Sequence, residues 1–163
     1  MPVAPIPEAT TYIPARALSI GVEYRLLTDD IIDAAFSRDL REASGIEADR
    51  PQAGLDDRGV SIHVCDAETG HEFVRFDNFG DDPHYHYIVP GSHNVVVPFD
   101  YVAHGDFLPW AFGRLRTQLP DMLREAGAAD LADRVVQSGG LSEEELTQVS
   151  EEVSRALKAA GVD

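Results

Sequence analysis

The chain has 163 residues, 44% of them hydrophobic, so it is long enough for one domain whose core needs no disulfide or metal to hold it together. Thirteen basic and twenty-nine acidic side chains give a formal net charge of −16, which disfavours binding to nucleic-acid backbones and anionic membrane surfaces. Cys65 is the only cysteine, which excludes an internal disulfide and a cysteine-rich zinc site.

The sequence contains no secretion signal and no apolar stretch of the roughly 20 residues that a membrane helix requires. With a single cysteine, this pattern is typical of a cytoplasmic protein. We therefore expect a soluble cytoplasmic protein with no membrane partner and with nucleic acid disfavoured as a partner.

The two ends of the chain indicate how it is organised. Residues 1–16 contain four prolines, which disfavour regular hydrogen-bonded structure, so we expect an extended Pro-rich arm. No change in composition divides residues 17–163, and we expect one α+β domain there. Within it, residues 141–161 give the clearest signal, an amphipathic helix in which Ser142 and Glu145 fit a capping box.

Alternation of apolar and polar residues predicts strands in the first part of the domain. The pattern of Ala17–Leu27 is typical of a strand, and Thr28 then caps a predicted helix that ends near Ala43. Between Gly59 and Phe99, turn residues recur at hairpin spacing, which predicts an antiparallel meander of four strands. Together these segments predict a sheet of about five strands, packed with an N-terminal helix and C-terminal helices.

The C-terminal part of the domain is predicted to be helical. An apolar stripe follows Asp106 and continues to Met122, and Pro120 should kink this helix because proline lacks an amide proton. A short helix is expected at residues 129–136, before the last helix.

Polar residues recur on one face of the predicted meander. Side chains two residues apart on a strand point the same way. If the hairpins pair apolar face with apolar face, five polar residues meet on the opposite face: His63, Arg75, Asp77, His84 and His86. The turn at residues 66–70 does not fix how the first two strands of the meander pair, and their register is open by one residue. A shift of one residue would move His63 to the other face.

The spacing of His84 and His86 is the strongest chemical signal. Two imidazoles on one strand face can bind one metal ion, with Asp77 as an oxygen ligand and His63 as a further candidate. Such a site suits a divalent ion, Zn, Fe or Mn, that activates water or oxygen. Without a metal, Asp77 would orient a histidine for acid–base chemistry and Arg75 would bind an anion, and a structural role is the third interpretation. The candidate catalytic residues are Asp77, His84, His86 and Arg75.

The segment HEFVRFDNFGDDPHYHYIVPG resembles a family of small uncharacterised bacterial proteins, in which R-F-D precedes P-H-Y-H-Y and a helix like LPWAFGRLRTQLPDMLREAG. The resemblance covers roughly residues 17–135 and implies a shared fold and site without a known reaction. A weaker similarity to TumE-like toxins of toxin–antitoxin pairs maps onto Arg75, Asp77, Asn78, Pro83, His84 and His86. Cupins also contain paired histidines, but the glutamate that follows them in cupins is missing here.

These observations lead to three functional hypotheses, and they leave open whether the chain is an enzyme. The first is an accessory enzyme that binds a metal ion or uses acid–base chemistry on a small polar ligand. The second is a non-catalytic subunit or adaptor, or a homo-oligomer, that associates through the Pro-rich arm and the C-terminal helix. The third is a toxin–antitoxin-type protein, which would need a local basic groove.

Overall fold

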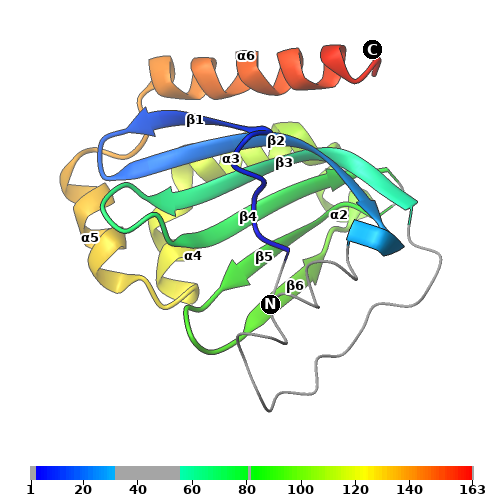
Figure 1. Ribbon diagram of the computed structural model, residues 1–163. Coiled ribbons are helices and arrows are strands. Elements are labelled where there is room, and N and C mark those ends of the chain that lie inside the picture. The colour runs from blue at the N-terminus through cyan, green and yellow to red at the C-terminus, as the bar shows by residue number, and fades with distance from the viewer. Residues whose placement is uncertain (1–2, 32–55, 81, 163) are drawn as a thin grey trace.

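The computed structural model describes residues 3–31, 56–80 and 82–162 and is built on one antiparallel sheet of six strands (Figure 1). The strands lie in the sheet in chain order, so each pairs with the next along the sequence: β1 (Thr10–Ala15), β2 (Leu18–Thr28), β3 (Asp56–Asp66), β4 (Glu72–Phe79), β5 (His84–Ile88) and β6 (Asn94–Pro98). Five helices follow the last strand: α2 (Tyr101–His104), α3 (Phe107–Thr117), α4 (Leu119–Glu125), α5 (Ala129–Gln137) and α6 (Glu143–Ala159).

The predicted meander is confirmed, because β3 to β6 are four antiparallel strands joined in sequence. The predicted total of about five strands is wrong, since the sheet has six. The additional strand, β1, comes from the Pro-rich arm and pairs with β2, from Thr10 opposite Glu23 to Ala15 opposite Leu18. Pro14 is tolerated because β1 is an edge strand, where a residue without an amide proton need not interrupt the ladder.

The helix predicted after β2 is described only at its start. Residues 29–31 are helical, and the rest of the helix predicted over Thr28–Ala43 lies outside the described residues. The helices that pack with the described sheet come from the C-terminal part of the chain, and together with the sheet they make the α+β class.

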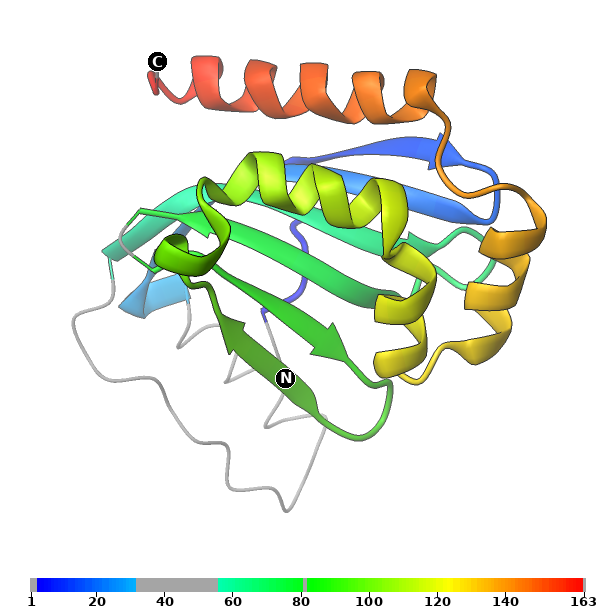
Figure 2. The same ribbon diagram turned by 180° about the vertical axis from the view of Figure 1, so that it is seen from behind.

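Helices α3 to α6 lie on one face of the sheet, which we call the helix face (Figure 2). The fully buried strand residues on this face are apolar: Ile20, Val22, Val60, Ile62, Val64, Val74 and Phe76. Each helix adds buried apolar residues to the same core, among them Leu115, Leu123, Leu131 and Val149. Removal of this apolar surface from water is the main term that holds the fold together.

Two predicted signals explain where these helices begin and end. At Pro120 the chain does not merely kink, because α3 ends at Thr117 and α4 begins at Leu119, with the proline in the tolerant first turn. The capping box of α6 is confirmed, since Glu145 N donates to Ser142 Oγ and Ser142 N donates to Glu145 Oε2. None of the helices in the described ranges combines the length and apolar character that a membrane span requires.

The opposite surface of the sheet, which we call the polar face, is turned away from helices α3 to α6. Residues 3–9 cross this face on the way to β1 (Figure 1). Although the face is polar, several of its charged side chains are buried, and these form the candidate site.

Candidate metal centre

Two rows of side chains cross the polar face because β2 to β5 share one register. Within a row, residues of neighbouring strands stand directly opposite one another. The first row contains Glu23, Ser61, Asp77 and His84, and the second contains Gly21, His63, Arg75 and His86. The structure thus places all five residues predicted for this face on it, and the pairing of His63 with Arg75 settles the open register.

Asp77, His84 and His86 form a group that could hold a metal ion. One ligand atom from each residue lies within 4.8 Å of the other two. Both histidines direct Nε2 at the same carboxylate oxygen, with Asp77 Oδ2 at 2.9 Å from His86 and 3.5 Å from His84. Ligand atoms of a tetrahedral zinc site, with bonds of about 2.0–2.1 Å, stand about 3.3 Å apart. The His86–Asp77 distance is shorter than this value and the His84–Asp77 distance is slightly longer, so a small shift of each ring would bring these two pairs to the spacing of a metal site.

The second ring nitrogen of each histidine faces an oxygen atom. His84 Nδ1 lies 2.7 Å from the backbone carbonyl oxygen of Asp82, and His86 Nδ1 lies 2.9 Å from Oδ1 of Asn94. Because a carbonyl oxygen only accepts hydrogen bonds, each Nδ1 is placed to donate a proton to it, and each Nε2 is left facing Asp77. Without a metal ion, a proton on His86 Nε2 forms the hydrogen bond to Asp77, and with a metal ion the Nε2 lone pair would bind the ion in place of that proton. Metal-binding histidines are typically oriented in this way, through a hydrogen bond from the nitrogen that does not bind the metal.

Asp77 is an anion in this environment, although only 2% of it is exposed. Burial acts to raise the pKa of Asp77, but the hydrogen bond with His86 and the positive charge of Arg75 outweigh it. Ser61 Oγ donates a further hydrogen bond to Asp77 Oδ1, and the pKa lies well below its usual range. An ionised carboxylate beside two imidazole Nε2 atoms is a ligand set for a cation.

Two acidic residues beside His84 were not part of the predicted site. Asp57, near the start of β3, interacts electrostatically with Asp82, His84 and Asp77, and burial raises the pKa of Asp57. Asp82 supplies the carbonyl oxygen that holds His84. Asp57 lies in β3 on the same face as Ser61, but the strand predicted from the sequence began at Gly59, and Asp82 lies outside the strands, where alternation gives no guidance. Their charges add to the negative potential that favours a bound cation.

Arg75 is bound by Glu72 and is not available to an external anion in this structure. Its Nε and Nη2 donate to the two carboxylate oxygens of Glu72 at 2.7 and 2.6 Å. His63 Nδ1 lies 2.6 Å from the same carboxylate. Burial acts to raise the pKa of Glu72, but these hydrogen bonds lower it to about 2. His63, a candidate ligand in the sequence, therefore lies in this neighbouring cluster and outside the Asp77 group.

Glu72 reaches the polar face because of a β-bulge. Strands β3 and β4 pair Val64 with Val74 and then Cys65 with Glu72, which leaves Phe73 as an extra residue. One extra residue reverses the alternation of side chains beyond it. Strict period-two reasoning from the sequence could not have found this carboxylate.

Strand β2 contributes a second buried ion pair that sequence reasoning missed. Glu23 is 1% exposed and Arg25 is 3% exposed, and Arg25 Nε lies 3.6 Å from Glu23 Oε1. Burial and the charge of Arg75 lower the pKa of Arg25. Burial acts to raise the pKa of Glu23, but contacts with His63 and Arg25 lower it. The alternation of β2 could have indicated both residues, since they share a face with Ser19 and Gly21.

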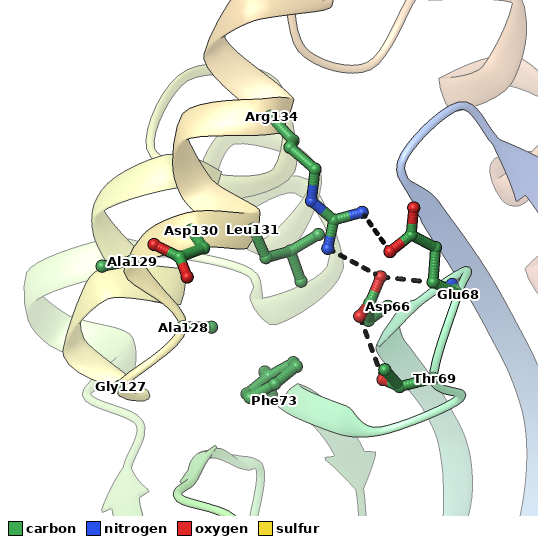
Figure 3. Close-up of a pocket in the computed structure, with 10 residues that line it drawn as sticks. All are labelled: Asp66, Glu68, Thr69, Phe73, Gly127, Ala128, Ala129, Asp130, Leu131 and Arg134. Atoms are coloured by element: carbon green, nitrogen blue, oxygen red, sulfur yellow. Dashed lines mark hydrogen bonds and ion pairs between the residues drawn. The ribbon is translucent and has the colours of Figure 1, made fainter.

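A separate hollow of about 510 Å³ lies between the turn after β3 and the start of α5 (Figure 3). Apart from Asp130, its charged side chains bind one another: Arg134 lies 3.0 Å from Asp66 Oδ1 and 3.6 Å from Glu68 Oε2. Thr69 Oγ1 donates to Asp66 Oδ2 at 3.0 Å. Because these groups already have partners, the hollow is a weaker candidate than the polar face.

Comparisons with known proteins identify a family for this chain but do not indicate an activity. No match was found among curated proteins or among solved structures. Residues 12–153 match the model of a family described as a domain of unknown function, DUF7700, and this span includes the Asp77–His84–His86 group. The match agrees with the expected resemblance to an uncharacterised family, whereas the similarity to TumE-like toxins stays a prediction. Since the match covers most of the chain, the protein belongs to the DUF7700 family.

Proposed function

We propose that this protein binds a divalent transition-metal ion through Asp77, His84 and His86 and uses it on a small polar ligand. The main support is that Nε2 of His84 and of His86 both face one carboxylate oxygen of the ionised Asp77. In both rings, Nδ1 faces an oxygen acceptor. A proton on His86 Nε2 joins that ring to Asp77 alone, whereas a metal ion would bind both rings and the carboxylate. A metal ion satisfies all three ligands at once.

The ligand set supports the choice of metal and of chemistry. Two imidazole nitrogens and one carboxylate oxygen suit Zn, Fe or Mn and leave further coordination positions open. A bound ion of this kind would supply Lewis acidity, which lowers the pKa of a bound water or polarises an oxygen of the ligand. His84 has a side chain that is 15% exposed, against 8% for His86 and 2% for Asp77, so a ligand would approach from the His84 side.

The neighbouring residues would position the metal ligands. Ser61 and Arg75 keep Asp77 ionised, and Asn94 and Asp82 fix the histidine rings. Arg75, a candidate catalytic residue in the sequence, would act through Asp77 because its own donors are bound to Glu72.

Metal analysis tests the proposal. The protein is purified without an affinity tag or chelator, and its metal content is measured by plasma mass spectrometry. We expect close to one transition-metal ion per chain in the wild type and almost none in the His84→Ala/His86→Ala variant. A matched His71→Ala/His93→Ala variant removes two histidines outside the group and should keep its metal. Equal metal content in all three proteins, or none in the wild type after incubation with Zn, Fe(II) and Mn salts, would overturn the proposal.

A non-catalytic subunit or adaptor is the second candidate function. It is favoured by the burial of the Asp77–His86 pair and by exposed apolar residues near the two ends of the chain, Ile6 at 42% and Val162 at 43%. Under this alternative the polar cluster is structural, and the terminal segments bind a larger protein. A metal-free wild type that co-purifies stoichiometrically with one protein from its own cells would support it.

A further inference from the structure

The N-terminal segment, residues 3–9, is fixed to the polar face by two buried charged side chains. Arg25 Nη2 donates to the backbone carbonyl oxygens of Val3 and Ala4, at 2.9 and 3.1 Å. Glu23 Oε2 accepts a hydrogen bond from the backbone amide of Ile6 at 3.2 Å. Arg25 and Glu23 thus offer donors to carbonyl oxygens and an acceptor to an amide, which is what an extended peptide main chain requires.

These contacts use the main chain of the segment and almost none of its side chains. Ala4 and Ile6 are exposed, and Val3 is only half-buried. The segment therefore contributes little apolar burial, and its side chains do little to determine which sequence binds. A different segment of the same backbone geometry could make the same hydrogen bonds.

The prolines of this segment help to explain why its main chain can bind Arg25 and Glu23. Pro5 and Pro7 flank Ile6 and carry no amide proton; the chain is extended up to Ile6 and then turns at residues 7–9, where Ala9 N donates to the carbonyl oxygen of Ile6 at 3.0 Å. In its extended part, residues 3–6, the carbonyl oxygens of Val3 and Ala4 accept hydrogen bonds from Arg25, whereas that of Ile6 accepts from Ala9 and Thr10. Recognition of preformed, extended, proline-rich peptides follows the same logic.

Two buried polar atoms beside residues 3–6 lack a well-formed hydrogen bond. Glu23 Oε1 and His63 Nε2 are buried and form no well-aligned hydrogen bond among the described residues, and their nearest charged partners are Arg25 Nε at 3.6 Å from Glu23 Oε1 and Glu23 Oε2 at 3.4 Å from His63 Nε2. Glu23 and His63 are 1% and 0% exposed, and unpaired polar atoms at that depth carry a desolvation cost. A peptide seated slightly deeper, or with a donor at this point, would complete the hydrogen bonding.

We propose that Arg25 and Glu23 form a binding seat for an extended, proline-rich peptide main chain, and that residues 3–6 of the protein occupy it in cis. The segment is a displaceable occupant, and its release opens the seat to a peptide of the same chemistry in trans. The seat contains none of Asp77, His84 and His86, so the inference stands or falls independently of the proposed metal function.

The test uses the full chain in metal-free buffer. Ile6→Pro removes the amide proton that Glu23 accepts, and Ile6→Ala is the matched control because it keeps that proton. A fluorescent peptide with the sequence of Val3–Thr10 is titrated against each protein by anisotropy, together with a second peptide that has proline at the Ile6 position. Hydrogen–deuterium exchange reports in parallel whether residues 3–9 are released.

The cis segment acts at an effective concentration of about 1 mM, so it should block a free peptide in the wild type and in Ile6→Ala. We expect faster exchange of the segment in Ile6→Pro and at least tenfold tighter binding of the first peptide to that variant, with the proline-substituted peptide binding at least tenfold more weakly. If exchange is unchanged in Ile6→Pro, the amide contact does not hold the segment and the proposal fails. It also fails if the released variant binds neither peptide, or binds both equally.

Discussion

The two faces of the sheet are built from the same strands and bury their side chains in opposite ways. On the helix face, Val, Ile and Phe side chains of β2 to β4 pack against α3 to α6. On the polar face, the intervening residues are just as buried, but they include Glu23, Arg25, Arg75 and Asp77. Burial of apolar side chains stabilises the fold directly. A buried charge loses its hydration, and its ion pairs and hydrogen bonds must first offset that cost.

This difference indicates what each face is for. The helix face accounts for the stability and uniqueness of the fold, since its apolar residues form one continuous core. The polar face would stabilise as well or better with apolar residues of similar volume. Its network of carboxylates, arginines and histidines therefore fits a functional role, and the predictions below separate the two faces.

Truncation of the helix face should give the largest effect. Phe76→Ala removes a fully buried ring that stacks near Tyr85 and Trp110, and we expect the free energy of unfolding to fall by about 4 kcal/mol. Urea denaturation followed by circular dichroism measures the loss. Metal affinity of the folded variant should stay at the wild-type value, and a loss below about 1 kcal/mol would contradict the account of the core.

Breaking one ion pair on the polar face should cost slightly less. Glu72→Gln leaves the 2% exposed Arg75 without its bidentate partner, so we expect a loss of about 3 kcal/mol. The double variant Glu72→Gln/Arg75→Met removes the uncompensated charge as well and should recover a large part of that loss. A double variant less stable than the single one would show that the pair itself stabilises the fold, and the contrast between the faces would weaken.

Acid should destabilise the protein through the polar face. The pKa of Glu72 is about 2 in the folded state, below its ordinary value of 4.5, and the pKa of Asp77 is also lowered. The stability that these carboxylates contribute is complete above pH 4.5 and is lost as the pH falls through the folded values, because the unfolded chain then binds protons first. Melting temperatures measured from pH 6 to pH 2 should fall more steeply for the wild type than for Glu72→Gln, and parallel curves would contradict this assignment.

Removal of a positioning residue should give the smallest effect on the site. Asn94→Ala takes away the oxygen that faces His86 Nδ1, and we expect metal affinity to fall about 10- to 100-fold. Asn94→Asp keeps an acceptor oxygen and should retain most of the affinity. Competition with a fluorescent chelator measures both constants, and an unchanged affinity in Asn94→Ala would show that this contact does not orient the ligand.

The sequence predicted the parts of the molecule that follow a simple period. Alternation in β3 to β5 placed His63, Arg75 and Asp77 on one face, and the capping signal of Ser142 located α6. It missed β1, because Pro14 argues against a strand unless the strand is known to lie at an edge.

The sequence also failed to predict two residues of the site, Glu72 and Asn94, and the reasons are again local. Glu72 reaches the polar face only through the bulge at Phe73, which breaks the period that the prediction relied on. Asn94 comes from β6, and its contact with His86 depends on how β5 and β6 pair and on the rotamers of both side chains. Neither effect can be read from residue spacing, whereas the Asp77–His84–His86 group could be, because it needs only the register of one hairpin.

The most direct test of the central claim is the coordination of a bound metal ion. X-ray absorption at the zinc edge, on protein loaded with one equivalent of Zn, should show two imidazole nitrogens and a carboxylate oxygen at about 2.0–2.2 Å. The His86→Ala variant should show one imidazole. The same imidazole count in both proteins, or a shell of oxygen ligands alone, would contradict the assignment of this group as a metal centre.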